Sequence, residues 1–169
     1  MQIQVPLVNG FLADEYTKFA TDADRINGKP AKSFPISIKD VPSGTKSLAI
    51  YFKDFDSVPV CGFVWIHWLA ANIPVIDKIP SDASRKKPFD FVQGSNSNCS
   101  RFLPENSGPQ IGYTGPQPPI GIHDYELTIY ALDNTLELED GYYLNDFLEK
   151  IEGHVLEKQN VILPATAEK

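Results

Sequence analysis

The stretch from Ser47 to Pro74 constrains the fold of this chain more than any other. It consists of an apolar run, a short acidic segment and a second apolar run, and both runs are apolar on both faces over most of their length. Such runs predict strands that are buried on both sides in the middle of a packed sheet. Three polar groups, Asp54, Asp56 and His67, interrupt this hairpin. A charge at the end of a core strand caps a turn or lines a pocket, and here we expect a pocket.

Length and composition indicate an ordinary globular domain. The 169 residues fit a single domain over residues 1–169 with a full hydrophobic core. Fourteen prolines and eleven glycines favour many short elements joined by turns over a helical bundle. The net charge of −7 repels nucleic acid and anionic lipid, so we expect no nucleic-acid partner. The sequence has neither an apolar run near 20 residues nor a signal-like N-terminus, which predicts no membrane insertion and a cytoplasmic location.

The two cysteines, Cys61 and Cys99, form neither a metal-binding pair nor a disulfide framework. We interpret them as free thiols in a reducing compartment. Cys61 adjoins core strand residues and Cys99 lies in a polar segment, so we expect Cys99 to react faster.

A second informative region runs from Gly108 to Leu132. Its first part, up to His123, is rich in glycine and proline and predicts a stiff, shaped loop that can grip a ligand at low entropic cost. The strand that follows starts at His123. Its period of two places His123, Tyr125, Leu127 and Ile129 on one face.

Elsewhere the pattern predicts an edge strand within residues 1–12, a strand over 34–39, and one helix, Leu144–Lys158. The helix has an apolar stripe, a candidate N-cap at Asn145 and an Asp146–Lys150 pair. The stripe consists of Leu144, Phe147, Leu148, Ile151 and Val155. The basic run 85–87 is interpreted as part of a solvated loop, and His154 as a core or surface histidine.

The residues themselves leave two enzymatic alternatives open. Asp54 and His67 with Ser57 would suggest nucleophilic hydrolysis, but no strand-to-helix elbow or oxyanion-hole motif accompanies Ser57. Two histidines with a carboxylate would suggest a metal site of the 2-His-1-carboxylate kind. We prefer a site with no catalytic residue, no metal and no cofactor.

Four segments in order carry a resemblance to a known family. They read Pro-Ser-Gly-Thr-Lys-Ser-Leu-Ala-Ile from Pro42, Asp-Phe-Asp-Ser-Val-Pro from Asp54, Trp-Ile-His-Trp-Leu-Ala-Ala-Asn from Trp65, and Gly-Pro-Gln-Pro-Pro-Ile-Gly-Ile-His-Asp-Tyr from Gly115. The last three are similar to the Asp-Pro-Asp-Ala-Pro motif, the Trp-x-His strand and the His-Arg-Tyr loop of the phosphatidylethanolamine-binding protein family, which includes the Raf kinase inhibitor proteins. The order and spacing extend over about residues 34–160.

The resemblance implies a mainly β fold, a two-sheet antiparallel β-sandwich with a peripheral C-terminal helix. It also implies a small anion pocket at one end of the sandwich. The ligand-binding residues carried over by motif are Asp54, His67, Gln117, Pro118, His123 and Tyr125. The residues implied to support the site are Asp56, Trp65, Gly115 and Pro119.

The resemblance points to a non-enzymatic protein that binds a small anion or a phosphorylated head group. The alternative is an inhibitor of a protein kinase or protease that is regulated through the pocket, and a homodimer is a further expectation. The chain departs from the family motifs at Phe55, Ser57 and Asp124, where the family has proline, alanine and arginine. The last departure changes a charge beside the expected pocket.

Overall fold

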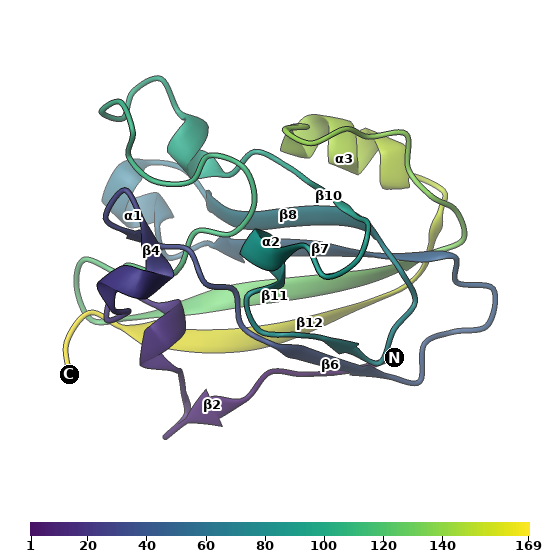
Figure 1. Ribbon diagram of the computed structural model, residues 1–169, viewed down its shortest axis with the longest axis horizontal. Coiled ribbons are helices and arrows are strands. Elements are labelled where there is room, and N and C mark those ends of the chain that lie inside the picture. Colours follow the sequence, from purple (N-terminus) through teal and green to yellow (C-terminus); the bar gives the residue numbers. More distant parts are fainter.

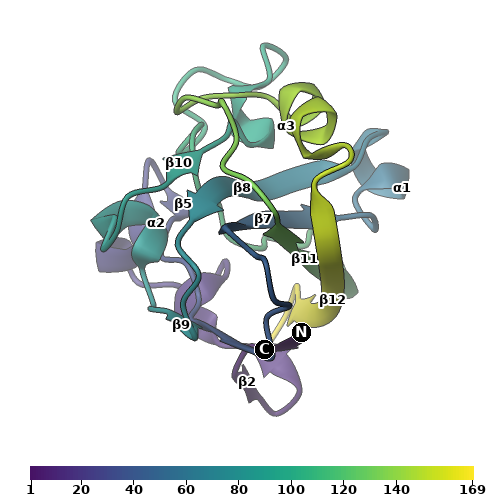
Figure 2. The same ribbon diagram turned by 90° about the vertical axis from the view of Figure 1, so that its right-hand side faces the viewer.

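The computed structural model describes residues 1–169 and consists mainly of two antiparallel sheets that pack face to face (Figures 1 and 2). The larger sheet has five strands in the order β10 (Val92–Gln93), β8 (Trp65–Ile73), β7 (Ser47–Asp54), β11 (Ile122–Leu132) and β12 (Val155–Thr166). The smaller sheet has the order β1 (Gln2–Gln4), β6 (Ile36–Lys39) and β9 (Lys78–Ile79). The predicted β-sandwich is confirmed.

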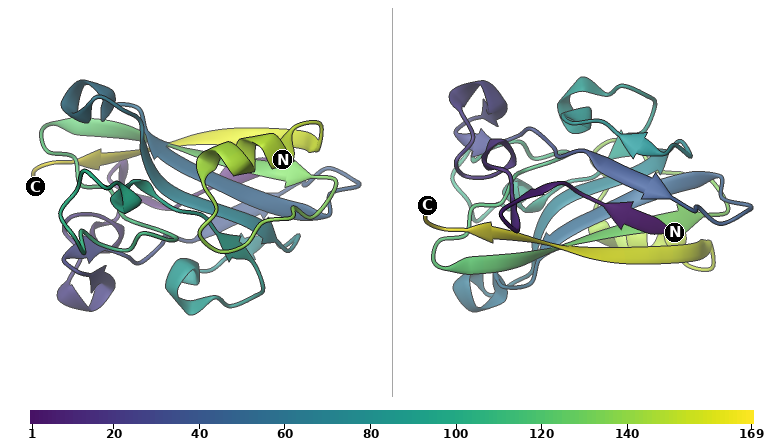
Figure 3. Two further views of the ribbon diagram at one scale, coloured as in Figure 1. Left: turned by 90° about the horizontal axis from the view of Figure 1, so that it is seen from above. Right: turned by 90° about the horizontal axis from the view of Figure 1, so that it is seen from below.

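Short elements surround the two sheets (Figure 3). Two small hairpins pair β2 (Leu7–Val8) with β3 (Phe11–Leu12), and β4 (Arg25–Ile26) with β5 (Lys29–Pro30). The α-helices are α1 (Val58–Cys61), α2 (Ala83–Lys86) and α3 (Leu144–Ile151). The 3₁₀ turns are η1 (Asp14–Tyr16), η2 (Asp22–Asp24) and η3 (Ser97–Cys99). No helix is both long and apolar enough to cross a membrane.

The main core lies between the sheets and is rich in aromatic rings. Phe34, Phe52, Trp68 and Tyr113 are all at most 1% exposed. The Phe34 ring meets the Phe52 ring edge-on, with 5.1 Å between centroids and an interplanar angle of 84°. Such edge-to-face contacts favour one packing arrangement over others. The central strands β7 and β8 are therefore buried, as their apolar runs predict.

A second apolar cluster covers the outer face of the large sheet under α3. Phe147 of α3 is fully buried, and its ring contacts Tyr130 of β11 at 5.6 Å between centroids. Phe147 also packs in the same cluster as Ala49 of β7 and Leu69 of β8. The central strands are thus apolar on both faces because each face has its own core.

The predicted helix is wrong in its second half. The helix ends at Ile151, Gly153 adopts a positive φ of 78°, and the chain then enters the twelve-residue strand β12. Val155 therefore belongs to β12, where it pairs with Leu132 across a bulge in the ladder with β11. Glycine at a left-handed position ends helices readily.

The start of the helix also differs from expectation. Tyr143 is the N-cap residue in place of Asn145, and its backbone N–H donates to the Asp146 carboxylate at 3.2 Å. Lys150 lies nearest to Glu137, at 3.9 Å, instead of pairing with Asp146. Within the stripe Leu148 is 47% exposed, so Phe147 and Ile151 provide the buried contacts of α3.

The basic run 85–87 is more structured than the predicted solvated loop. Arg85 Nη2 lies 2.9 Å from a carboxylate oxygen of Asp24 and 2.9 Å from one of Asp82. Lys87 Nζ lies 2.6 Å from Asp140, and only Lys86 has a mainly exposed side chain. These ion pairs tie α2 to η2 and to the segment before α3.

Replacing Phe147 with alanine should lower the free energy of unfolding by about 3–5 kcal/mol, because the side chain is fully buried. Leu148→Ala is the matched control on the neighbouring, half-exposed position, and it should cost less than about 1 kcal/mol. Urea unfolding of the two variants measures both values. Equal losses would show that α3 does not pack through Phe147.

Candidate functional site

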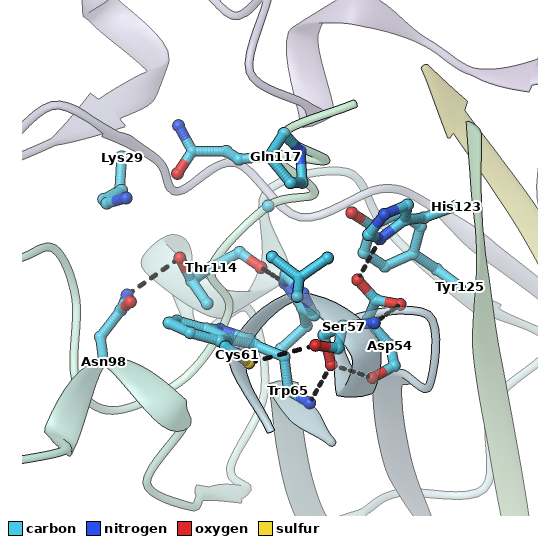
Figure 4. Close-up of a pocket in the computed structure, with 14 residues that line it drawn as sticks. Lys29, Asp54, Ser57, Cys61, Trp65, Asn98, Thr114, Gln117, His123 and Tyr125 are labelled. Atoms are coloured by element: carbon cyan, nitrogen blue, oxygen red, sulfur yellow. Dashed lines mark hydrogen bonds and ion pairs between the residues drawn. The ribbon is translucent and has the colours of Figure 1, made fainter. Parts of the chain in front are cut away.

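A cavity of about 230 Å³ opens at the end of the sandwich where β7 and β8 meet the start of β11 (Figure 4). Its lining comes from five parts of the chain: the β5 hairpin, the β7–β8 connection with α1, β8, η3, and the segment from Thr114 to Tyr125. The lining residues are Lys29, Asp54, Ser57, Val60, Cys61, Trp65, His67, Asn98, Thr114, Gly115, Gln117, Pro119, His123 and Tyr125.

Strand pairing brings Asp54, Tyr125 and His123 together. Asp54 is the last residue of β7 and lies directly opposite Tyr125 of β11. His123 precedes Tyr125 by two residues and therefore shares its inward face. All three residues are at most 6% exposed.

A β-bulge places His67 in the same cavity. In the β7–β8 ladder Phe52 pairs with Trp68 and Lys53 with Ile66, so His67 is the extra residue. Trp68 packs in the core between the sheets and His67 lines the cavity, although the two are adjacent in sequence. Bulges of this kind re-aim a side chain. In a regular strand His67 and Trp68 would face opposite sides of the sheet. Because of the bulge, both side chains lie on its inner side.

Asp54 is the hub of the hydrogen bonds in the site. Its Oδ2 lies 2.8 Å from Nδ1 of His123, and its Oδ1 accepts from the Ser57 backbone N–H at 3.1 Å. A carboxylate oxygen can only accept here, so His123 Nδ1 carries a hydrogen and Nε2 is its remaining polar atom. When His123 is protonated, the contact becomes an ion pair.

The Ser57 hydroxyl braces the turn after β7. Its Oγ lies 2.7 Å from the carbonyl of Asp54 and 2.8 Å from that of Phe63, and it accepts from the Trp65 backbone N–H at 3.0 Å. Both its donor and its acceptor capacity are therefore engaged by backbone groups. The hydroxyl has a structural part in shaping the turn, which is different from the exposed nucleophile of the hydrolase alternative.

His67 is held in one tautomer by the backbone. Its Nδ1 lies 2.7 Å from the carbonyl oxygen of Thr114, which can only accept, so Nδ1 carries the hydrogen. Burial lowers the pKa of His67 to about 4, against the partly compensating effects of the Thr114 hydrogen bond and the Asp54 charge. His67 is therefore neutral near pH 7.

Tyr125 stays a neutral hydroxyl group. Burial first, and then the negative charge of Asp54, raise its pKa well above the usual value. Its ring contacts both histidines, with centroids 5.1 Å from His67 and 6.1 Å from His123.

The predicted glycine- and proline-rich loop forms one wall. A Cβ atom at Gly115 would lie 2.3 Å from the Tyr16 carbonyl oxygen, so the close approach of two backbones requires glycine there. The Gly115 N–H donates to Pro30 O at 2.8 Å, which fixes the loop against β5.

The structure brings most of the sequence-predicted site residues around this cavity. Asp54, His67, Gln117, His123 and Tyr125 line it. Trp65, Gly115 and Pro119, expected as supports, also line it.

Pro118 and Asp56 lie outside the lining. The buried Pro118 presents its carbonyl to Lys18 Nζ at 3.1 Å. Asp56 accepts from the Asp124 backbone N–H at 2.8 Å and so joins the turn after β7 to the start of β11.

Sequence reasoning missed several lining residues. They are Lys29, Ser57, Val60, Cys61, Asn98 and Thr114. Lys29 and Asn98 come from segments with no recognisable motif. The only sequence feature that could have indicated Asn98 is the polar run 94–101 in which it lies. In the structure the Asn98 side chain donates to Thr114 Oγ1 at 3.0 Å. The structure groups no three His, Cys, Asp or Glu side chains in a way that could hold a metal ion.

Comparison with known proteins identifies the family. The sequence model for the phosphatidylethanolamine-binding protein family matches residues 4–165. YxkA of Bacillus subtilis is 44% identical over 159 residues, covering 93% of this chain and 95% of the relative. A UPF0098 protein of Methanothermobacter thermautotrophicus is 41% identical over 133 residues, covering 76% of this chain and 78% of that protein. The chain belongs to the phosphatidylethanolamine-binding protein family.

Solved structures agree with this assignment. The crystal structure of a phosphatidylethanolamine-binding protein homologue from Chlamydia trachomatis has a TM-score of 0.67 at 31% identity and covers 82% of each chain. The crystal structure of Escherichia coli YbcL has a TM-score of 0.76 at 22% identity, covering 99% of this chain and 98% of that one. The latter likeness is one of fold.

The buried neutral His67 should make stability depend on pH. The unfolded chain protonates this histidine below about pH 6.5, whereas the folded protein does so only near pH 4. The unfolded state therefore binds more protons in this window, and stability falls as pH falls. The control is His67→Asn, which keeps an N–H for the Thr114 carbonyl but cannot titrate. Between pH 7 and pH 4 the free energy of unfolding should fall by about 3 kcal/mol more in the wild type than in this variant. Urea unfolding at several pH values measures this, and parallel profiles would contradict it.

The order of cysteine reactivity should be the reverse of the one expected from sequence. Both thiols are free, but Cys61 is exposed at the cavity whereas Cys99 is half-buried. Mass-spectrometric labelling with iodoacetamide should therefore modify Cys61 several times faster. Labelling of Cys99 first would show that the α1 segment shields Cys61 in solution.

Proposed function

We propose that the protein is a non-enzymatic binding protein whose cavity holds a small oxyanion, such as phosphate or a phosphorylated head group. The observation that carries the proposal is the buried His123 ring. Asp54 holds its Nδ1, which leaves Nε2 as the polar atom of a ring that lines the cavity. A protonated histidine can then donate a charge-assisted hydrogen bond to an anion.

Other groups around the cavity support anion binding. Lys29 adds a positive charge, and Figure 4 shows it across the cavity from His123 and Asp54. The Tyr125 hydroxyl and the Gln117 side chain can donate neutral hydrogen bonds. Asp54 carries a negative charge, but both of its oxygens are already engaged by His123 and Ser57. We interpret it as the group that orients His123 and not as a ligand contact.

A second candidate function is inhibition of a protein kinase or protease by docking at the mouth of the cavity. The observation that favours it is a set of exposed apolar side chains from two segments joined by the Asp56–Asp124 contact. These side chains are Phe55, Val58, Val60, Phe63, Ile120 and Ile122, which are between 42% and 73% exposed. Exposed apolar side chains on neighbouring segments often belong to an interaction surface.

We propose that the chain acts as a single domain in the cytoplasm, as its composition suggests.

His123→Ala should weaken the binding of inorganic phosphate or phosphoethanolamine by about ten- to a hundredfold, because a charged donor is lost. Tyr125→Phe should cost less, since it removes only a neutral donor. His154→Ala is a matched control because its Nδ1 also pairs with an aspartate, Asp133, at 2.8 Å but lies outside the cavity. Isothermal titration calorimetry measures all four proteins. Unchanged affinity in His123→Ala, or no binding by the wild type, would refute the anion site.

A further inference from the structure

The thiol of Cys61 lies at the rim of the cavity, and neither the fold nor the proposed function uses it. Cys61 is the last residue of α1, is exposed, and also lines the cavity. It forms no disulfide. Its Sγ lies 3.3 Å from the Ser57 carbonyl oxygen and 3.5 Å from that of Phe63. A thiol is a weak donor, so these contacts leave the sulfur available for reaction.

The local backbone keeps this thiol at the rim. Gly62 follows α1 with a positive φ of 91°, and its N–H donates to the Val58 carbonyl at 2.9 Å. The Ser57 hydroxyl before the helix lies 2.8 Å from the Phe63 carbonyl after it. These contacts close the chain into a compact turn around α1. A group attached to Cys61 therefore stays next to the opening of the cavity.

Positive charge lies on the other side of the cavity. Lys29 and His123 both line it, and Figure 4 shows Lys29 across from Cys61. A Cβ atom at Gly108 would lie 2.5 Å from Lys29 Cγ, so the lysine stem passes directly over that glycine and its position is confined. Fixed positive charge raises the local concentration of anionic reagents. Anionic partners of the thiol are therefore favoured, although the whole chain is acidic.

Two buried side chains present unpaired polar atoms to the same space. The His67 and His123 rings are 5% and 6% exposed, and both line the cavity. The Thr114 carbonyl engages Nδ1 of His67 and the Asp54 carboxylate engages Nδ1 of His123, which leaves each Nε2 without a partner in the protein. Buried polar atoms favour a hydrogen-bonding partner. A polar group attached to Cys61 finds such partners inside the cavity.

We propose that Cys61 is a thiolation site, at which a small disulfide that carries carboxylates, such as oxidised glutathione, forms a mixed disulfide and closes the cavity to oxyanions. The Cys61 thiolate attacks one sulfur of the reagent, whose S–S bond breaks, and the other half leaves as a thiolate that takes up a proton. One disulfide replaces another, so no further oxidant is required. This inference rests on the proposed anion-binding function and adds a regulation of the same site.

The geometry of the mixed disulfide accounts for the closure. The new S–S bond is about 2 Å long, so the first carbon atoms of the attached group lie at the rim. The carboxylates of a glutathionyl group have Lys29 and His123 as positive partners. A cavity of about 230 Å³ that contains this group has no room left for an oxyanion beside His123. Excess thiol reverses the exchange and reopens the cavity.

Mass spectrometry tests the site of modification. The reduced protein is incubated with oxidised glutathione, and its peptides are mapped before either thiol has reacted to completion. Cys61 should carry the glutathionyl group at least about fivefold more often than the half-buried Cys99. Cys61→Ser should abolish this adduct, and Cys99→Ser is the matched control that should keep it. Preferential modification of Cys99, or no adduct at all, would overturn the inference.

Isothermal titration calorimetry with inorganic phosphate tests the closure. Each protein is titrated before and after treatment with oxidised glutathione, with the excess reagent removed. The affinity of the wild type and of Cys99→Ser should fall at least about tenfold and recover after treatment with dithiothreitol. In Cys61→Ser the treatment should change the affinity less than about twofold.

The outcomes of this titration are distinguishable. A Cys61 adduct that leaves the phosphate affinity unchanged would overturn the inference while leaving the anion site intact. No binding of phosphate by the reduced wild type would overturn the proposed function and the closure together. The adduct itself is read from its mass and does not depend on phosphate.

A charge variant tests the class of reagent. Lys29→Gln removes the positive charge across the cavity and keeps a polar side chain. The rate of Cys61 modification is measured with oxidised glutathione, which is anionic, and with bis(2-hydroxyethyl) disulfide, which is uncharged. The ratio of the first rate to the second should fall severalfold in the variant, because only the anionic reagent loses an electrostatic attraction. An unchanged ratio would contradict the preference for disulfides that carry carboxylates.

Discussion

The site depends on the hydrogen bonds that the buried Asp54 carboxylate accepts. Removing a carboxylate from water is costly unless hydrogen bonds or charges replace the lost solvent. Asp54 receives its replacements from two different segments, the Ser57 backbone in the turn after β7 and the His123 ring on β11. The same contacts that make its burial tolerable therefore fix the turn and orient the histidine. The site and the local fold cannot be separated here, because each contact serves both.

Strand register converts these contacts into a cavity. Asp54 and Tyr125 are direct partners across β7 and β11, and His123 follows on the same face. A regular β8 would not have allowed both His67 and Trp68 to point inward, but the bulge does. Trp68 thereby completes the core between the sheets while His67 lines the cavity beside it. The β-bulge in β8 therefore lies at the boundary between the hydrophobic core and the cavity.

The sequence predicted the parts of the site that strand patterns and motifs encode. Asp54, His67, His123 and Tyr125 lie on strands, where alternation and the family motifs determine their neighbours. Lys29 and Asn98 could not be found in this way, because only the packing of the β5 hairpin and η3 against the loop at Thr114 brings them close. Pro118, expected among the ligand-binding residues, lies outside the lining, whereas Pro119, expected as a support, lines the cavity, because loop geometry has no fixed period.

The error at the C-terminal helix has a different origin. Residues 144–151 form a true amphipathic helix, and the apolar Val155 happens to continue its spacing. Pairing with β11 over almost its whole length supplies backbone hydrogen bonds that a short helical extension could not match. Gly153 marked the boundary, and its positive φ is the local reason that the helix ends before it. Tertiary pairing outweighed the local pattern.

The departures from the family motifs divide between the interior of the site and its mouth. Ser57 lies inside, where its hydroxyl links the backbone of Asp54, Phe63 and Trp65. Phe55 and Asp124 lie outside the cavity lining and are exposed. The Phe55 ring lies 5.4 Å from Lys53 Nζ, and Asp124 contributes its backbone N–H to Asp56. The interior therefore retains the polar groups of the family motifs that we propose contact a ligand, whereas the turn after β7 and the start of β11 gain an exposed apolar ring and a negative charge. Both regions lie next to the turn after β7, but different side chains form each of them. Substitutions at Phe55 or Asp124 can therefore change the outer surface without changing the side chains inside the cavity.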